Sequence, residues 1–291
     1  MKFGITVVWF NPTAEQVKEI LKFKYKNDCA VCIVDNSQSR NNKFESDIVG
    51  VNGINYIHNK NLGGIAGGFN RGVNHLFNCQ DIGFVFTMDQ DSILDIDFFV
   101  NMTDFCISKD AKLSCPNFYD RNSKTYGSFV LLTPFSYQIT NSGSTHFCIS
   151  SGMCISREAW LSIGQFNEDL IIDHVDTEYA LRAYVNNIEI KVNYDQCLNH
   201  AIGERTKHKF LGVTIKPNHH SYIRKYYIIR NGTFLSFIYF KHTKGYFKLN
   251  VFRIIHEYLA VMLYEKDKLR KLKFMSKGLL HAIRGRLGAI K

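Results

Sequence analysis

The chain has 291 residues, of which 45% are hydrophobic, 14% are aromatic and four are proline. This composition excludes a disordered or collagen-like chain, and the length allows one large domain with an appendage. The net charge of +10 is concentrated near the end, where residues 266–291 hold nine Lys or Arg and a single acid.

Strands and helices are predicted to alternate along the first half of the chain. Apolar runs predict strands at residues 4–10, 30–34, 55–58 and 83–88. Apolar periodicity predicts one helix at residues 14–25, and a second helix is expected to follow the glycine-rich residues 61–68 and to end at residue 77. The polar stretch through residue 47 is predicted to be a loop. Strands that are apolar on both faces are typical of a mainly parallel sheet covered by helices on both sides.

The second half is predicted to have strands near residues 128–132, 146–155 and 188–192, a helix at 174–185, and helices from residue 219 onward. We therefore expect an α/β domain over residues 1–215 and a helical, basic and aromatic extension over residues 216–291. No apolar run reaches the roughly 18 residues that a spanning helix needs, and the N-terminus lacks the features of a signal peptide.

The basic tail alternates with apolar residues at helical spacing. This pattern favours an amphipathic helix on an anionic membrane surface. The alternative is a helix that packs on the protein and keeps its charged face in solvent.

Eight cysteines are scattered, mostly in apolar runs, which suits a reducing cytoplasm. Cys29 and Cys32 form a CxxC motif inside a predicted strand, and no second pair follows at zinc spacing. A metal or redox role for them is therefore not favoured.

Polar residues follow the predicted strands where each strand ends: Asn11, Asp35, residues 59–64 and residues 89–91. Ligands of parallel sheets bind at this edge. Asp89 and Asp91 offer hard oxygen ligands for Mg²⁺ or Mn²⁺, which would neutralise a diphosphate; the alternative is a solvated turn. The glycine-rich segment 61–68 fits neither a P-loop nor GxGxxG, which argues against NTP hydrolysis and NAD binding.

A second acidic segment spans residues 166–182. Glu178 can pair with Arg182 at i, i+4, and Asp173 can cap a helix, so these charges have structural explanations. Asp176, expected in the first turn of that helix, could instead act as a general base.

Six segments in one order over about the first 205 residues together resemble the family 2 glycosyltransferases with the GT-A fold. They are Val7-Val8-Trp9-Phe10-Asn11-Pro12, Val34-Asp35-Asn36-Ser37, Asn59-Lys60-Asn61-Leu62-Gly63-Gly64, Asp89-Gln90-Asp91, Ser151-Gly152-Met153 and the stretch from Phe166 to Tyr179. Met-Asp-Gln-Asp-Ser and Ile-Asp-His-Val-Asp-Thr-Glu are most similar to the rhamnosyltransferase branch.

The resemblance implies roles for individual residues. Those that would bind the nucleotide sugar are Trp9, Asn11, Asp35, Asn61, Gly63 and Asp89. Those that would hold Mg²⁺ or Mn²⁺ are Asp89, Asp91 and His200. Asp176 would be the catalytic base. The chain departs from the family at Val175, where many members have Glu, and at Trp9, where Thr is usual.

The resemblance also implies an inverting, metal-dependent transfer of L-rhamnose from dTDP-β-L-rhamnose to a lipid-linked saccharide during O-antigen or capsule synthesis. The protein would be cytoplasmic and peripheral, at the inner face of the bacterial cell membrane. A galactofuranosyl or other hexosyl donor and a catalytically inactive membrane-bound scaffold remain alternatives. A sugar-1-phosphate nucleotidyltransferase is disfavoured, because no basic glycine-rich loop follows the first strand. No nucleic-acid partner is expected, because no nucleic-acid fold signature accompanies the aromatic and basic residues 219–231.

Overall fold

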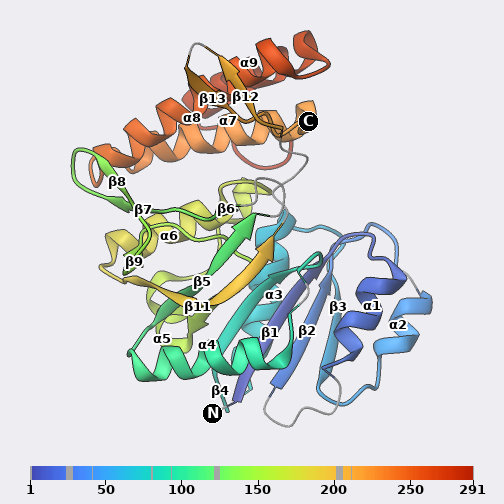
Figure 1. Ribbon diagram of the computed structural model, residues 1–291. Coiled ribbons are helices and arrows are strands. Elements are labelled where there is room, and N and C mark those ends of the chain that lie inside the picture. Colours follow the sequence, from blue (N-terminus) through green and yellow to red (C-terminus); the bar gives the residue numbers. More distant parts are fainter. Residues whose placement is uncertain are drawn as a thin grey trace. The chain divides into compact units, whose positions relative to one another are not determined.

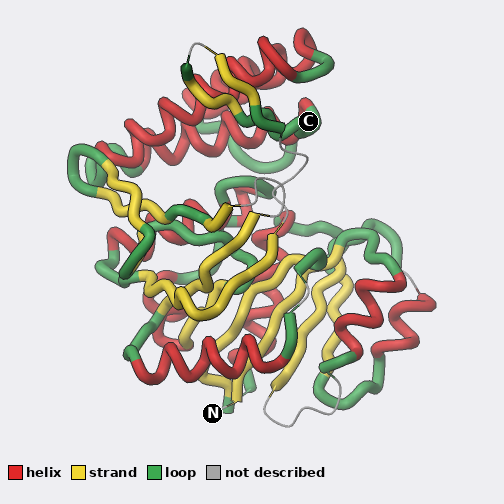
Figure 2. The backbone as a smooth tube through the Cα atoms, viewed as in Figure 1, coloured by secondary structure: helices red, strands yellow, loops and turns green. Residues whose placement is uncertain are grey.

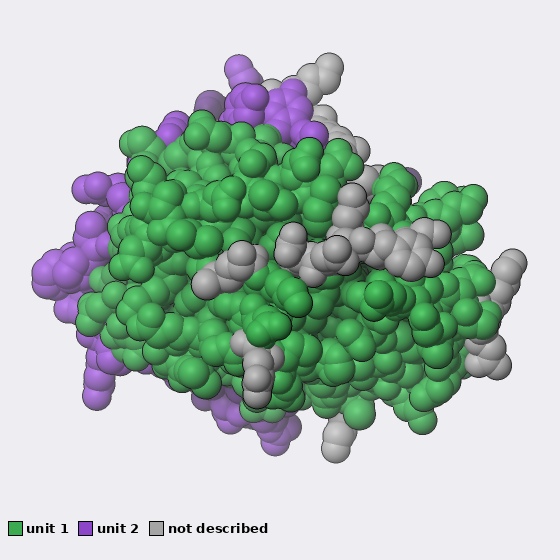
Figure 3. Space-filling view, turned by 90° about the horizontal axis from the view of Figure 1, so that it is seen from below, with its two compact units in different colours: residues 1–117, 142–171, 175–198 green, residues 118–141, 172–174, 199–291 purple. Residues whose placement is uncertain are grey.

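The computed structural model describes residues 2–23, 29–40, 42–79, 81–92, 94–120, 125–200, 206–210 and 212–290, without the side chains of residues 42, 43, 120, 200, 210 and 213. The chain divides into two compact units, which Figure 3 colours separately. Unit 1 comprises Met1–Asn117, Ser142–Ile171 and Val175–Leu198, and unit 2 comprises Phe118–Asn141, Ile172–His174 and Asn199–Lys291. The domain boundary expected after residue 215 stays a prediction.

Unit 1 is built on a mixed sheet with the strand order β3-β2-β1-β4-β10-β5-β11-β9 (Figure 1). The strands are β1 (Lys2–Trp9), β2 (Cys29–Asp35), β3 (Ile54–His58), β4 (Ile82–Asp89), β5 (Leu113–Asp120), β9 (Ser144–Thr145), β10 (Met153–Ser156) and β11 (Ile190–His200). Strands β3, β2, β1 and β4 are parallel, and β10 runs antiparallel to β4 and β5. The expected helix-flanked, largely parallel sheet is confirmed.

The helices of unit 1 are α1 (Ala14–Leu21), α2 (Asn42–Ile48), α3 (Gly64–Phe77), α4 (Ile96–Ser108), α5 (Arg157–Ile163), the 3₁₀ helix η1 (Glu168–Leu170) and α6 (Val175–Val185). Helix α2 lies where a loop was predicted. Ile48 is fully buried and Phe44, four residues earlier, packs partly buried against the same core, but two apolar residues in a short polar helix are too few to mark a helical period in the sequence.

Side chains of β1 alternate between two differently covered faces, as a strand requires. Phe3 and Ile5 point into a core shared with α4, where Phe3 stacks on Phe99 at 6.2 Å between ring centroids. Figure 2 shows α4 and α3 on opposite sides of the sheet. The two helices thus bury the odd and even residues of β1 separately.

Helix α3 lies unusually close to β1 because glycines face the strand. A Cβ at Gly72 would overlap the side chain of Thr6, and a Cβ at Gly68 would come within 2.9 Å of Val8. These two glycines therefore allow α3 to pack directly on the sheet.

Among its described residues, unit 2 contains three long helices and two short hairpins, which Figure 2 shows as red and yellow tubes. The helices are α7 (Tyr222–Ile238), α8 (Lys244–Tyr264) and α9 (Lys268–Ile283). The strands are β6 (Thr125–Tyr126), β7 (Phe129–Leu132), β8 (Tyr137–Thr140), β12 (His208–Phe210) and β13 (Val213–Ile215), with β7 paired to β8 and β12 to β13. None of the helices in the described ranges is long and apolar enough to cross a membrane.

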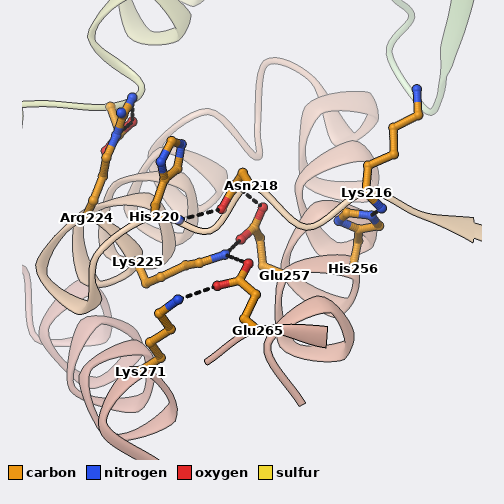
Figure 4. Close-up of polar contacts among 10 residues, drawn as sticks. Lys216, Asn218, His220, Arg224, Lys225, His256, Glu257, Glu265 and Lys271 are labelled. Carbon is orange, nitrogen blue, oxygen red and sulfur yellow. Dashed lines mark hydrogen bonds and ion pairs between the residues drawn. The ribbon is translucent and has the colours of Figure 1, made fainter. Parts of the chain in front are cut away.

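A buried ion cluster joins the three helices of unit 2 (Figure 4). Lys225 donates to Glu257 at 2.6 Å and to Glu265 at 2.7 Å, and Lys271 donates to the other oxygen of Glu265 at 2.7 Å. Lys225, Glu265 and Lys271 are at most 6% exposed. Lys271, counted with the tail's basic surface, is therefore an interior residue, because α9 packs this side chain against α7.

The last described residues are also bound to α7. The fully buried Arg230 donates from Nη1 to the carbonyl of Gly288, and the backbone N–H of Ile290 donates to the Tyr227 hydroxyl at 2.9 Å. The guanidinium lies over the rings of Tyr226 and Tyr227. Much of the segment Tyr226–Asn231 therefore has a structural use inside unit 2.

Candidate functional site

The carboxyl ends of four parallel strands meet at one edge of the sheet. Trp9 is in register with Asp35, Asp35 with His58, and Val8 with Asp89. The backbone N–H of Asn11 donates to the Ser37 hydroxyl at 2.7 Å, and Ser37 N–H donates to Asp35 at 2.8 Å. Trp9, Asn11, Asp35 and Asp89 are thus brought to the same edge, as the sequence predicts.

Asp35 is a buried carboxylate with protein partners on both oxygens. It is 1% exposed, and besides Ser37 it accepts from the Tyr56 hydroxyl at 2.8 Å. Burial and the adjacent carboxylate raise the pKa of Tyr56, so this hydroxyl stays protonated and remains a donor. Asp35 is therefore held in one orientation at the end of β2.

The side chain of Trp9 points into the core. It is completely buried, and its indole N–H has no hydrogen-bond partner among the described residues. Its backbone carbonyl accepts from Asn36 at 2.7 Å. Any contact that Trp9 makes with a ligand at this edge must therefore come from its backbone.

A chain of buried amides holds the loop between β3 and α3. Asn59 donates to Asn36 at 2.6 Å and to the carbonyl of Leu62 at 2.9 Å, and Asn36 donates to the carbonyl of Gly64 at 2.9 Å. Asn61 lies within this loop, exposed, with a φ of 56°. The loop that carries Asn61 is thus fixed from the strand side.

Gly63 and Gly64 approach the second acidic segment. Both have positive φ, and a Cβ on Gly63 would overlap Glu168, while one on Gly64 would overlap the carbonyl of Ile171. The N–H of Ile65 donates to that same carbonyl at 2.9 Å. Glycine is required here because the start of α3 packs directly on residues 168–171.

The Asp-Gln-Asp segment is tied to its surroundings by two glutamines. Gln90 accepts from the N–H of Phe10 at 2.7 Å and donates back to its carbonyl at 3.3 Å. Gln16 donates from Nε2 to Asp91 at 2.7 Å. The end of β1 therefore holds the side chain of Gln90, and the first turn of α1 holds the carboxylate of Asp91.

The donor set at this segment fits a hard divalent cation in part. Asp89 and Asp91 supply carboxylate oxygens, which Mg²⁺ and Mn²⁺ prefer. In the portion of the chain that the structure describes, no cluster of three or more His, Cys, Asp or Glu side chains suits a metal. The third predicted ligand, His200, has its side chain outside the described residues.

A cavity of about 200 Å³ lies beside this segment, lined by Gln16, residues 88–92 and apolar side chains of β1, α1 and α4. Glu15 and Glu19 line it as well, so its charged side chains are all acidic, and neither Asp35 nor Asn61 is among its lining residues.

Asp176 lies in the first turn of α6 and is partly buried. Its Oδ1 accepts from the N–H of Thr177 at 2.7 Å. A contact with Cys115 and burial raise the pKa of the Cys148 thiol, and the Asp176 charge adds to this effect. The carboxylate therefore lies near Cys148.

The predicted pair of Glu178 and Arg182 is confirmed, with two hydrogen bonds of 2.8 Å. Asp173 does not cap α6, because the helix begins at Val175 and Asp173 has a φ of 58°. Its carboxylate instead accepts from Arg224.

The backbone that leads to α6 is strained. Ile171, Asp173 and His174 have φ values of 66°, 58° and 61°, a region that non-glycine residues rarely adopt. Ile171 also has a ψ of −61°, the strained form of a γ-turn. Each such residue costs about 1–3 kcal/mol and persists only where its surroundings enforce it, often at functional sites.

Four supporting residues escaped the prediction: Gln16, Asn36, Asn59 and Gln90. Asn59 and Gln90 lie inside segments that the sequence marked as strand ends. Gln16 follows Thr13 by three residues, and the two side chains form a capping box, which is the signal that could have identified it.

The Glycosyl transferase family 2 model matches residues 11–162. A relative from Shigella flexneri, the dTDP-rhamnosyl transferase RfbF, is 25% identical over 294 residues, covering 96% of this chain and 93% of RfbF. Two solved structures of S. aureus TarS share the fold at 12% identity. TarS itself has a TM-score of 0.52 over 97% of this chain and 43% of its own length, so the chain spans less than half of that protein. TarS 1–349 in complex with UDP has a TM-score of 0.53 over 98% of this chain and 72% of its own.

Proposed function

Because the chain belongs to glycosyl transferase family 2, we propose that it is an inverting, metal-dependent rhamnosyltransferase that uses dTDP-β-L-rhamnose. The observation that carries the donor is the similarity to a dTDP-rhamnosyl transferase along nearly the full length of both chains. The acceptor is a lipid-linked saccharide, as in O-antigen or capsule synthesis.

The nucleotide binds at the carboxyl edge of the parallel strands. Asp35 accepts a hydrogen bond from the nucleobase, and the backbone of Trp9 and Asn11 lines the base pocket. Asn61 and Gly63 lie against the nucleotide. The fixed orientation of Asp35 and the amide-bound loop support this assignment, because an ordered site loses less entropy when it binds.

Asp89 and Asp91 would hold the divalent cation, with His200 as the third protein ligand, and the bound Mg²⁺ or Mn²⁺ would supply positive charge that offsets the negative charge of the diphosphate. Gln16 keeps Asp91 near the strand end through its 2.7 Å hydrogen bond.

Asp176 accepts the proton of the attacking acceptor hydroxyl. That oxygen forms a bond to the anomeric carbon while the bond from this carbon to the diphosphate oxygen breaks, and dTDP leaves with the electron pair. Attack from the face opposite the leaving group inverts the configuration, so a β-linked donor gives an α-L-rhamnoside. No covalent enzyme intermediate forms.

The protein associates with the inner face of the cytoplasmic membrane through unit 2. Phe252, Ile255 and Met262 lie on one side of α8 and are 53%, 50% and 46% exposed. The basic residues of α9 supply attraction to anionic lipids. An apolar helix face beside basic residues is typical of interfacial association.

A thermal-shift panel of nucleotide sugars, each with and without Mg²⁺ or Mn²⁺, tests donor and metal together. A ligand at 100 times its Kd adds about 2.7 kcal/mol to the stability of the folded state. We expect a metal-dependent shift with dTDP-rhamnose. A shift only with a UDP-hexose or UDP-galactofuranose would reject dTDP-rhamnose as the donor. A shift of the same size in the presence of EDTA would reject the metal site.

Turnover of dTDP-rhamnose by the wild type and by Asp176→Asn tests the chemistry. We expect the substitution to abolish nearly all transfer while the variant still binds the nucleotide sugar. Near-normal transfer by Asp176→Asn would reject this residue as the base, and no transfer by the wild type to any lipid-linked saccharide would favour the inactive scaffold.

A further inference from the structure

A cavity of about 490 Å³ lies within unit 2. Its walls come from α7, α8, the segment 214–218 and His174, all of which belong to that unit. The volume falls within the range of about 300–1,000 Å³ that small-molecule sites occupy. The described lining includes none of the residues assigned to the nucleotide sugar, the metal or the base, so the proposed function leaves this cavity without a ligand.

The cavity carries a net positive charge. Two cationic side chains line it, those of Lys216 and Arg253. The carboxylate in its described lining, that of Glu257, accepts from Lys225 at 2.6 Å and so belongs to the buried ion cluster. That cluster holds two lysines and two glutamates, so its charges cancel. The charge left in the cavity is therefore that of Lys216 and Arg253.

Two histidines line the cavity next to these cations. His256 accepts from the backbone N–H of Lys216 at 3.1 Å and so ties this residue to α8. In Figure 4, Lys216 lies beside His256 and extends its side chain away from the ion cluster. Burial and the charge of Arg253 lower the pKa of His174 to about 3, so this ring stays neutral. The positive charge of Arg253 therefore acts on the wall of the cavity.

The chain that builds the cavity is basic, which favours an anionic ligand. No Asp or Glu occurs between residues 205 and 256. Arg253 is exposed where it lines the cavity, and a guanidinium group matches the oxygens of a phosphate with two parallel hydrogen bonds. The chemistry of the site is therefore that of a phosphate group.

Apolar side chains distinguish a free phosphate from one attached to a lipid. Leu249, Phe252 and Ile254 line the cavity together with the cations. Phe252 is 53% exposed, and the 50% exposed Ile255 lies on the same side of α8. A free phosphate gains nothing from exposed apolar surface, whereas the glycerol and first acyl carbons of a phospholipid would bury it. The apolar wall therefore favours a lipid.

We propose that this cavity binds the phosphate headgroup of an anionic phospholipid, with Arg253 and Lys216 on the phosphate oxygens and Phe252 against the apolar part of the lipid. Such a site gives unit 2 a defined contact with one lipid molecule, beyond the general attraction between the basic residues of α9 and an anionic surface. The inference rests on the proposed membrane association of unit 2.

Isothermal titration calorimetry of the full chain with dihexanoyl phosphatidylglycerol, a phospholipid that is soluble as a monomer, tests the site without a membrane. EDTA is present, so that no divalent cation bridges the lipid to Asp89 or Asp91. We expect one lipid to bind per chain, at least tenfold more tightly than inorganic phosphate. Equal affinity for inorganic phosphate would assign the site to a free anion, and absence of lipid binding would remove the site; either result would overturn the proposal.

Substitutions of the two cations test their roles. Arg253→Gln should weaken lipid binding at least tenfold, and Lys216→Gln at least threefold. Arg253→Lys keeps the charge but loses the paired hydrogen bonds, so it should still weaken binding at least threefold. Because Arg253 is exposed, its substitution does not threaten folding. Unchanged affinity in Arg253→Gln, or in Arg253→Lys, would contradict a headgroup held by the guanidinium.

Lys248→Gln is the matched control, because Lys248 is an exposed cation of the same helix and is not among the residues that line the cavity. Its affinity for the lipid should stay within twofold of the wild type. A loss equal to that of Arg253→Gln would attribute binding to net charge and overturn the proposal. Failure of the wild type to sediment with anionic vesicles would instead reject the membrane association, whereas the soluble lipid reports on the cavity alone.

Discussion

Gln16 donates a hydrogen bond to Asp91 across 75 positions of sequence, at 2.7 Å, with the side chain that also closes the capping box of α1. The first turn of α1 is thereby connected to the second carboxylate of the Asp-Gln-Asp segment. A residue that a sequence pattern assigns to helix capping thus also orients a candidate metal ligand.

Gln16→Leu should weaken metal-dependent binding of the donor by about three- to tenfold. This is less than the roughly 1.5–3 kcal/mol of a hydrogen bond to a charged group, because the bond between Gln16 and Asp91 is exposed to solvent. Isothermal titration calorimetry with and without Mg²⁺ measures the effect. Thr13→Ala is the control, because it removes the cap at a cost of about 1 kcal/mol and leaves Gln16 with Asp91. Equal losses of affinity in both variants would show that capping alone matters.

Asp176→Asn should lower kcat by about 10²- to 10⁴-fold, the usual contribution of a general base, with donor affinity preserved. Single-turnover rates together with donor Kd values measure this. Asp169→Asn, in the same acidic segment, is the comparison, and a similar fall in both variants would argue against a specific base.

Gly72→Ala should destabilise unit 1 by about 1–3 kcal/mol, the usual cost of overpacking, because the new methyl would overlap Thr6. Urea denaturation measures the free energy of unfolding. Thr6→Ala, combined with Gly72→Ala, removes the hydroxyl and should recover part of the loss. If the double variant had a lower free energy of unfolding than Gly72→Ala alone, the close approach of α3 to β1 would be the wrong explanation.

Glu265→Gln should destabilise unit 2 by about 3–5 kcal/mol, because it leaves Lys271 buried without its carboxylate. Burial alone would raise the pKa of Glu265, but hydrogen bonds from Lys225 and Lys271 lower it below the ordinary value of 4.5. Its contribution to stability is thus fully present above about pH 4.5 and is lost as the pH falls through the lowered pKa. Chemical denaturation between pH 3 and pH 7 should show that the free energy of unfolding of the wild type falls at acid pH, and that it falls less in the variant.

Phe252→Glu together with Ile255→Glu should reduce binding to vesicles that contain anionic phospholipid, because both side chains are about half exposed on one side of α8. Co-sedimentation measures binding. Val185→Glu, on exposed apolar surface of unit 1 at 36%, is the control. Unchanged sedimentation of the α8 variant would reject that face as the membrane contact.

The elements that the sequence predicted correctly are those marked by a pattern of residues along the chain. Strands β1 to β4 were located within two residues because each is a short apolar run that ends in polar residues. The strand predicted at 146–155 was too long, since Gly152 turns with a φ of 80° and only Met153–Ser156 pairs with β4. Helix α4 was missed altogether: five of its residues are buried, and no clear polar face marks it.

The candidate site also contains some residues that a sequence motif marks and others that no motif marks. Asp35, Asp89 and Asp176 stand in motifs whose order along the chain suggested their roles, and those roles stay predictions. The buried pair of Lys225 and Glu265 had no such signal, because 40 positions separate the two residues. Sequence patterns report the neighbours of a residue along the chain, while a buried charge is explained by its neighbours in space.

The carbonyl of Gly288 accepts a hydrogen bond from the guanidinium of Arg230, which is completely buried. Deletion of residues 288–290 would therefore leave an interior cation without this acceptor and open a route for water to it. The loss of unfolding free energy on that deletion would measure how much these residues contribute to keeping the surroundings of α7 dry.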